Sequence, residues 1–330
     1  MSRFQILSLS GGGYMGLYTA CVLQEIEKQI GEPIGKYFDL ICGTSIGGIL
    51  ALGVAFEKPA ADMAESFIRH GEKIFPPNRS LLQRVFSPAY CAVPLRKAVT
   101  EILCDNKRLG EALHPVLVPT LNLTKGAPQV FKTPHNERLK TDWLKNPVDI
   151  AMATSAAPTI FPLAEIDNNL YADGGLYGNA PDMMGVHEAR FFFNIPEEQI
   201  HVLSVGTTNK SFSLGHSAGK NLGVVGWMQN FRLLRATMTS QQQLVHYMMG
   251  HMLEGRYMRI DTDQSEEQSK ELGLDNASPE AISTLRGLAT HSAQAASGKP
   301  EFAEFFKQLA PAPEYYYGPK ANDGPRIRTI

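Results

Sequence analysis

The stretch FDLICGTSIGG, residues 38–48, decides both the fold and the chemistry that we expect. Phe38–Cys42 is a short apolar run, typical of a buried parallel strand. Gly43–Gly47 then matches the pattern G-x-S-x-G, and the apolar segment Ile46–Phe56 predicts a helix. In this strand–turn–helix setting the sharp turn exposes the serine oxygen, and the flanking glycines remove steric clashes. We therefore expect Ser45 to be a nucleophile that precedes a helix.

A second strand–turn–helix unit stands before this one. Phe4–Ser10 predicts a strand, three glycines follow it, and Met15–Ile30 carries apolar residues at a period near 3.6 residues. Strand, helix, strand and helix joined by tight glycine turns predict an α/β domain with a parallel sheet. Further along the chain, Pro115–Leu123 and Gln199–Val205 predict core strands, and Asn146–Thr154 predicts a helix.

Composition narrows the class of protein. The 330 residues are 43% hydrophobic and 19% charged, as in globular chains, and the net charge of −2 excludes a general binder of nucleic acid polymers. The four cysteines form no CxxC pair and no zinc-type cluster with histidine, so we expect no metal site. The one long uncharged window, between Asp39 and Glu57, is shorter than the about 20 residues of a membrane-spanning helix. We expect a soluble, cytoplasmic protein.

The glycines after the first predicted strand have two interpretations. Glycines let backbone N–H groups approach a ligand, so Gly11–Gly13 fits an oxyanion hole. Gly11, Gly13 and Gly16 also match G-x-G-x-x-G, the dinucleotide fingerprint. That fingerprint needs an acidic residue at the end of the second strand, whereas Asp39 lies at its start. The oxyanion hole is therefore favoured, and the dinucleotide site remains the minor alternative.

A serine nucleophile also requires a base, and the sequence offers a carboxylate on a glycine-rich turn. Asp173 begins DGGLYGN after a short apolar stretch, although Asp-Gly is also a common turn signal. The stretch Ala153–Pro162 (ATSAAPTIFP) consists of small residues that end on prolines, and we expect it to pass close to a tightly packed site. A poorly solvated Asp173 with a raised pKa would serve as the base.

Taken in order, GGGYMG, GTSIG, ATSAAPTIFP and DGGLYGNAP resemble the patatin-like phospholipase family, over roughly Phe4–Thr208. The resemblance implies a three-layer α/β/α fold with a mostly parallel central sheet, and hydrolysis of lipid acyl esters by a Ser–Asp dyad without a cofactor. It implies Ser45 as the nucleophile, Asp173 as the general base, and the amides of Gly11, Gly12 and Gly13 as the oxyanion hole.

Two residues depart from the family pattern. Members often carry aspartate just before the glycines and arginine before the last one, where this chain has Ser10 and Met15. The departure affects the expected catalytic strength more than the reaction type. We expect residues 1–210 to form the catalytic region and residues 211–330 a helical extension packed on the same domain.

The resemblance also implies partners. A membrane lipid would be the substrate, reached by peripheral contact at the membrane surface. Some bacterial members act in anti-phage defence and are switched on by cyclic nucleotides, so the sequence leaves open a cyclic nucleotide activator and a homo-oligomer. A non-catalytic lipid- or nucleotide-binding module that keeps the fold is the alternative from another class.

Two competing sites are weaker. Chain order permits a Ser-His-Asp triad, because six histidines follow Asp173: His187, His201, His216, His246, His251 and His291. Several strands precede the nucleophile in that fold, however, whereas Ser45 follows only the second predicted strand. Asp261, Asp263 and Ser265 resemble the start of a calcium loop, but Glu266 replaces the expected glycine, which favours a solvated turn.

Overall fold

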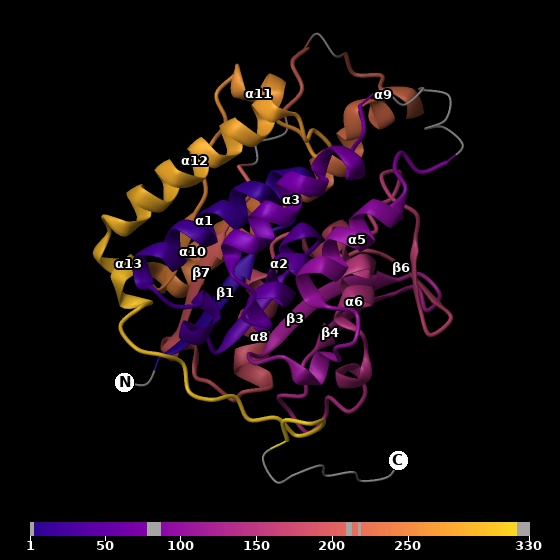
Figure 1. Ribbon diagram of the computed structural model, residues 1–330. Helices are drawn as coiled ribbons and strands as arrows, with labels where there is room; N and C mark the ends of the chain where they lie inside the picture. Colours follow the sequence, from indigo (N-terminus) through magenta and orange to yellow (C-terminus); the bar gives the residue numbers. More distant parts are fainter. Residues whose placement is uncertain (1–2, 78–86, 209–212, 217–218, 322–330) are drawn as a thin grey trace.

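A mixed β-sheet forms the centre of the protein (Figure 1). The computed structural model describes residues 3–77, 87–208, 213–216 and 219–321. Across the sheet the strands follow the order β5-β6-β3-β2-β1-β7-β8, and β4 pairs with β3 outside this path. The strands are β1 (Phe4–Leu9), β2 (Leu40–Gly43), β3 (Val116–Asn122), β4 (Ala127–Lys132), β5 (Ala164–Ile166), β6 (Asn169–Asp173), β7 (Ile200–Val205) and β8 (Tyr257–Ile260). The five strands from β3 to β8 in this order are parallel to one another.

Helices cover both faces of the sheet. On one face, α2 (Ile46–Ala55) and α6 (Pro147–Thr154) contact the strands. The same hydrophobic cluster includes α1 (Gly16–Ile30), α3 (Ala60–Ile74), α5 (Ala92–Leu103) and α12 (Pro279–Ser297); α3 and α5 pack on neighbouring helices, and α12 lies along α1 in Figure 1. The other face packs against α8 (Asp182–Phe191) and α10 (Arg232–Leu253). Short helices complete the chain: α7 (Gly175–Gly178), α9 (Val224–Met228), α11 (Gln268–Glu271) and α13 (Pro300–Glu304). The expected α/β/α fold with a mostly parallel sheet is confirmed.

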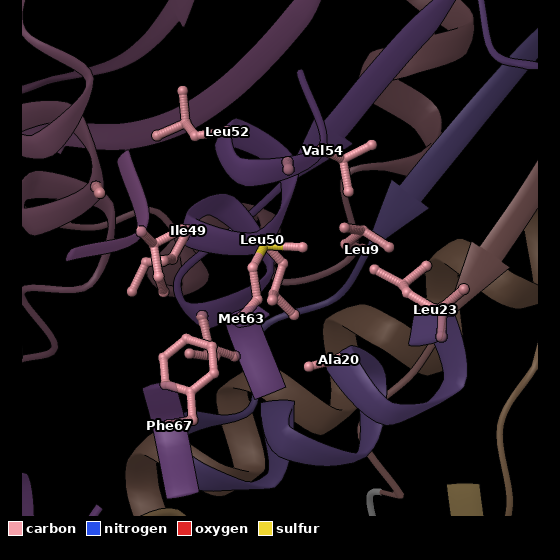
Figure 2. Packing of buried hydrophobic residues seen from close by; sticks show 14 of the residues in the cluster. Leu9, Ala20, Leu23, Ile49, Leu50, Leu52, Val54, Met63 and Phe67 are labelled. Carbon is pink, nitrogen blue, oxygen red and sulfur yellow. The ribbon is translucent and has the colours of Figure 1, made fainter. Parts of the chain in front are cut away.

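The central strand β1 shows why these residues form a strand covered on both faces. Successive side chains of a strand point to opposite faces. Phe4 and Ile6 belong to the cluster with α8 and α10, while Leu7 and Leu9 belong to the larger cluster with α1 and α2. In Figure 2 Leu9 lies beside Leu23, Leu50 and other residues of that larger cluster. Because both faces are buried, four of the six residues of the strand are apolar, and the two polar ones, Gln5 and Ser8, are buried as well.

The elements expected from the N-terminal half are present within two residues of their predicted bounds. The chain after residue 210 differs from the expected helical extension, because it also supplies β8, the edge strand beside β7. The division of the chain at residue 210 stays a prediction. Among the described residues, no helix has both the length and the apolar character needed to cross a membrane.

Strand β3 brings two distant segments together. It pairs with β4 along one edge. On the opposite edge its first residues pair with β2 in parallel (Leu117 with Cys42), and its last residues pair with β6 in antiparallel fashion (Thr120 with Asp173). Because β2 and β6 run toward each other along this shared edge, their carboxyl ends meet. Ser45 follows the end of β2, and Asp173 ends β6.

Candidate active site

Ser45 lies on a tight turn between β2 and α2. Its backbone has φ 56° and ψ −128°, a conformation that residues with a side chain rarely adopt. The flanking glycines are required by contact: a Cβ on Gly43 would lie 2.1 Å from the carbonyl oxygen of Gly47, and one on Gly47 would lie 2.2 Å from that of Leu9. The turn therefore presses closely against the end of β1, as the G-x-S-x-G pattern predicts.

The side chain of Ser45 is hydrogen bonded to Asp173. Ser45 Oγ donates to Asp173 Oδ2 at 2.7 Å. The other carboxylate oxygen, Oδ1, accepts from the backbone N–H of Gly175 at 2.7 Å, and the backbone N–H of Asp173 donates to the carbonyl oxygen of Ala156. These contacts hold the carboxylate in one orientation, with Oδ2 directed at the serine.

Burial sets the acidity of this carboxyl group. Asp173 is only 4% exposed, and burial raises its pKa to about 7, while the hydrogen bonds from Gly175 and Ser45 pull the pKa in the opposite direction. A carboxylate with a pKa near neutral pH can take a proton from a hydroxyl far better than an ordinary one. The expected rise in the pKa of Asp173 is present.

The backbone of the serine turn is fixed by Thr154, at the end of α6. The N–H of Ser45 donates to Thr154 Oγ1 at 3.0 Å, and that hydroxyl donates to the carbonyl oxygen of Pro119 at 2.7 Å. Thr154 and Ala156 both belong to the stretch ATSAAPTIFP, so the expectation that this stretch passes by the site is confirmed. The role of Thr154 was not predicted, because a run of small residues does not show which hydroxyl faces the turn.

The glycine loop after β1 is hydrogen bonded to the rest of the protein at Gly11, whereas the N–H groups of its next two residues are not. The N–H of Gly11 donates to the carbonyl oxygen of Asn179, and the carbonyl oxygen of Gly11 accepts from Asn179 Nδ2 and Thr207 Oγ1. Within the described parts of the chain, the N–H groups of Gly12 and Gly13 donate to no protein acceptor. Asn179 and Thr207 were not predicted, although both lie in conspicuous stretches, DGGLYGNAP and LSVGTT.

The first turn of α2 adds further donors. The leading N–H groups of a helix have no partner inside it and carry partial positive charge. Those of Ile46 and Gly47 come directly after Ser45. Gly13, from the glycine loop, and Ile46 line the same cavity as Ser45, so main-chain donors from both segments lie in its neighbourhood.

An apolar cavity opens beside Ser45 and Asp173. It measures about 50 Å³. Nearly all of its lining is hydrophobic and comes from helices and from the segments between them: Ile46, Ile49, Phe67, Ile74, Phe75, Leu95, Ile160, Phe161, Leu234, Met238 and Leu274. The proline-rich stretch Phe75–Leu95 contributes its two ends, and the middle of this stretch, residues 78–86, lies outside the described residues.

The competing sites find no support in the geometry. Across the described residues, no histidine is hydrogen bonded to Ser45 or Asp173. His201 lies at the opposite, amino end of the sheet, where it contacts Arg3. Asp39 lies at that same amino end of the sheet, just before β2, and its carboxylate accepts a hydrogen bond from the backbone N–H of Gln5. It is therefore far from the glycine loop, where a dinucleotide site would need its acidic residue. No cluster of three or more metal-binding side chains occurs in the described ranges.

Comparison with known proteins identifies the family. The family model described as "Patatin-like phospholipase" matches residues 7–184, which include the glycine loop, Ser45 and Asp173. The chain is 39% identical to a cGAMP-activated phospholipase of Pseudomonas aeruginosa (strain BWHPSA011 / Pa011), over 97% of this chain and 96% of that protein.

Two further relatives carry the same name. One, from Vibrio cholerae serotype O1, is 37% identical over 93% of this chain and 95% of its own length. The other, from Escherichia coli (strain TW11681), is 34% identical over 86% of both chains. The resemblance drawn from the sequence motifs is thus confirmed: the chain belongs to the patatin-like phospholipase family and is a lipid acyl hydrolase.

Proposed function

We propose that this enzyme cleaves fatty-acyl esters of membrane phospholipids with a catalytic dyad of Ser45 and Asp173. The observation that carries the proposal is the 2.7 Å hydrogen bond from Ser45 Oγ to a buried carboxylate whose pKa lies near neutral pH. A hydroxyl becomes an effective nucleophile when an adjacent base accepts its proton. No cofactor is needed for this reaction.

In the first step, Ser45 Oγ forms a bond to the carbonyl carbon of the ester. Its proton passes to Asp173 Oδ2, and the carbonyl π electrons move to the carbonyl oxygen, which becomes an oxyanion. The free N–H groups of Gly12 and Gly13 are suited to hold this oxyanion, because they have no protein acceptor in the described structure. Gly11 supports them, since both its N–H and its carbonyl oxygen are held by Asn179.

In the second step, the bond between the carbonyl carbon and the leaving oxygen breaks, and Asp173 returns the proton to that oxygen. This leaves an acyl group on Ser45. Asp173 then accepts a proton from a water molecule that attacks the acyl carbon, and the free fatty acid departs with Ser45 reprotonated. General-base catalysis of this kind contributes roughly 10²- to 10⁴-fold.

The apolar cavity beside Ser45 is suited to an acyl chain, because its lining is almost entirely hydrophobic. Leu234 and Met238, from the first two turns of α10, form one wall of the cavity.

A cyclic nucleotide activator is part of this proposal. Three relatives that cover most of the chain are named cGAMP-activated phospholipases. Peripheral contact with the membrane surface and a role in bacterial anti-phage defence belong to the same proposal, and a homo-oligomer stays a prediction.

The test is release of fatty acid from vesicles of mixed bacterial phospholipids, with and without cGAMP and a panel of other cyclic dinucleotides. We expect little release without ligand and at least about tenfold more with one member of the panel. Ser45→Ala should abolish release while binding the same ligand. Equal release with and without every ligand would reject the activation, and release by Ser45→Ala would reject the nucleophile.

A further inference from the structure

One arginine side chain connects the ends of three neighbouring parallel strands. Arg259, on β8, pairs in register with Ser204 on β7. Its Nη1 donates to Ser204 Oγ at 2.7 Å and to Ser10 Oγ at 3.2 Å, and its Nη2 donates to Asp261 Oδ2 at 2.5 Å. Ser10 follows β1 and directly precedes Gly11. The guanidinium group therefore reaches from the edge strand to the residue at which the glycine loop begins.

Asp261 extends this network to the other side of the loop. Its Oδ1 accepts from the backbone N–H of Thr208 at 2.9 Å. The preceding residue, Thr207, donates from its hydroxyl to the carbonyl oxygen of Gly11 at 3.3 Å. Thr207 also lies against the next glycine, since a Cβ on Gly12 would be 2.3 Å from Thr207 Oγ1. The network thus contacts the loop at two places: at Ser10, which precedes it, and at Thr207, which contacts Gly11 and Gly12.

We propose that Arg259 is a positioning residue, which holds Gly12 and Gly13 in the geometry required for catalysis through Ser10 and through Asp261. The proposal rests on the oxyanion role assigned to these two glycines under the proposed function. Arg259 touches neither Ser45 nor Asp173 in the described structure, so it acts only through the loop.

The chemistry of the side chain fits this role. A guanidinium group is planar and presents several donors at fixed angles, whereas an ammonium group is a point charge without such a fork. Arg259 serves three acceptors on three different segments at once. Its side chain is 15% exposed and that of Asp261 is 24% exposed, so the pair is largely withdrawn from water, and either partner alone would leave a poorly solvated charge.

The test compares Arg259 with Arg256, which directly precedes β8. Arg256 donates to the backbone carbonyl oxygens of Glu197 and Ile200, at the end of β7 that lies away from the glycine loop. For Arg259→Ala we expect kcat to fall about 10²-fold with KM within about threefold, because the loss concerns the transition state. Arg256→Ala should keep kcat within about threefold of the wild type.

Restoration of kcat by added guanidinium ion distinguishes a positioning role of Arg259 from a general effect on folding. The partial exposure of the Arg259 side chain gives a small cation access to the vacated place. Guanidinium at tens of millimolar should restore kcat of Arg259→Ala at least about tenfold, and urea at the same concentration should not. Arg259→Lys preserves the charge beside Asp261 and should fold, yet its kcat should remain at least about tenfold low.

Hydrogen exchange of the peptide that contains residues 9–16 tests the positioning role without measuring catalysis, so it does not depend on the proposed function. Faster exchange there in Arg259→Lys than in Arg256→Ala is expected even if the wild type hydrolyses no ester. Equal exchange in the two variants, or a kcat of Arg259→Lys within about threefold of the wild type, would overturn the positioning role. If Arg259→Ala does not fold, the lysine variant decides the question.

Discussion

The hydroxyl of Ser45 and the carboxylate of Asp173 lie 2.7 Å apart although 128 residues separate them along the chain. A single strand explains this contact, because β3 pairs with β2 and with β6 on the same edge. The two strands approach each other end to end, and the residues that follow one and terminate the other must meet. This contact is therefore a consequence of strand register.

The pH dependence of the reaction follows from the raised pKa of Asp173. The carboxylate must be ionised to accept the serine proton, and burial raises its pKa to about 7. We expect kcat/KM of the activated enzyme to increase tenfold per pH unit below about pH 7 and to level off above it. Hydrolysis of a soluble p-nitrophenyl ester between pH 5 and about pH 9 measures this profile. An inflection near pH 4, the ordinary value of a carboxyl group, would contradict it.

The same group links stability to pH. The pKa of Asp173 in the folded protein, about 7, exceeds its ordinary value of 3.8, so the unfolded chain loses the proton first as the pH rises. As the pH rises from about 4 to about 7, the free energy of unfolding of the wild type should therefore fall, by on the order of 1 kcal/mol per pH unit at most.

Asp173→Asn lacks this titration. Its melting temperature relative to the wild type should accordingly increase from pH 5 to about pH 8, even though it is inactive. Ser45→Ala is the matched control, since it retains the buried carboxylate and should still lose stability as the pH rises. A difference between Asp173→Asn and wild type that stays constant across this range would show that the carboxyl group is not perturbed.

Thr154 provides a test of the backbone support for the serine turn. Thr154→Val keeps the shape of the side chain but removes the acceptor for the Ser45 N–H and the donor to Pro119. Because these groups are buried, we expect a loss of about 1–3 kcal/mol in the free energy of unfolding and at least about a tenfold loss in kcat. Thr154→Ser retains the hydroxyl and should stay close to the wild type in both measurements. Similar kcat values for the valine and serine variants would show that the Thr154 hydroxyl does not support the serine turn during catalysis.

Gly47 tests the close approach of the serine turn to β1. Gly47→Ala would place a Cβ 2.2 Å from a backbone oxygen of Leu9, which cannot move without shifting the strand. We expect a loss of about 1–3 kcal/mol or more in stability, together with loss of activity. Gly250→Ala is the control, because nothing lies within 4 Å of a Cβ there and α10 gains about 0.5–1 kcal/mol from the replacement. Equal melting temperatures of the two variants would refute the steric argument.

Local sequence rules were sufficient to predict the central elements and to single out Ser45 and Asp173, whose side chains are in contact. The strand–turn–helix units around residues 4–56 follow from apolar patterns and glycine turns that act over a few residues, and the structure contains them. Ser45 and Asp173 could be proposed because each stands in a recognisable glycine-rich turn. Their contact, in contrast, depends on the pairing of β2 and β6 with β3, which no local pattern encodes.

The supporting residues depend on register and were not predictable in this way. Asn179, Thr154 and Thr207 act through side chains whose direction is fixed only when distant strands and helices pack. Strand β8 has four residues with alternating partial burial, too short for a periodicity signal, and Arg259 lies within it. The interpretation of Asp261 as part of a solvated turn is wrong for its side chain, which is paired with Arg259.

The most direct test of the central claim is covalent labelling of the activated enzyme with a fluorophosphonate, read by mass spectrometry of the intact protein and of its peptides. We predict one adduct, on Ser45, that forms at a rate rising through about pH 7 and is at least about 10²-fold slower in Asp173→Asn. Labelling of Asp173→Asn at the wild-type rate, or an adduct on any residue other than Ser45, would contradict the claim that this serine is activated by that carboxylate.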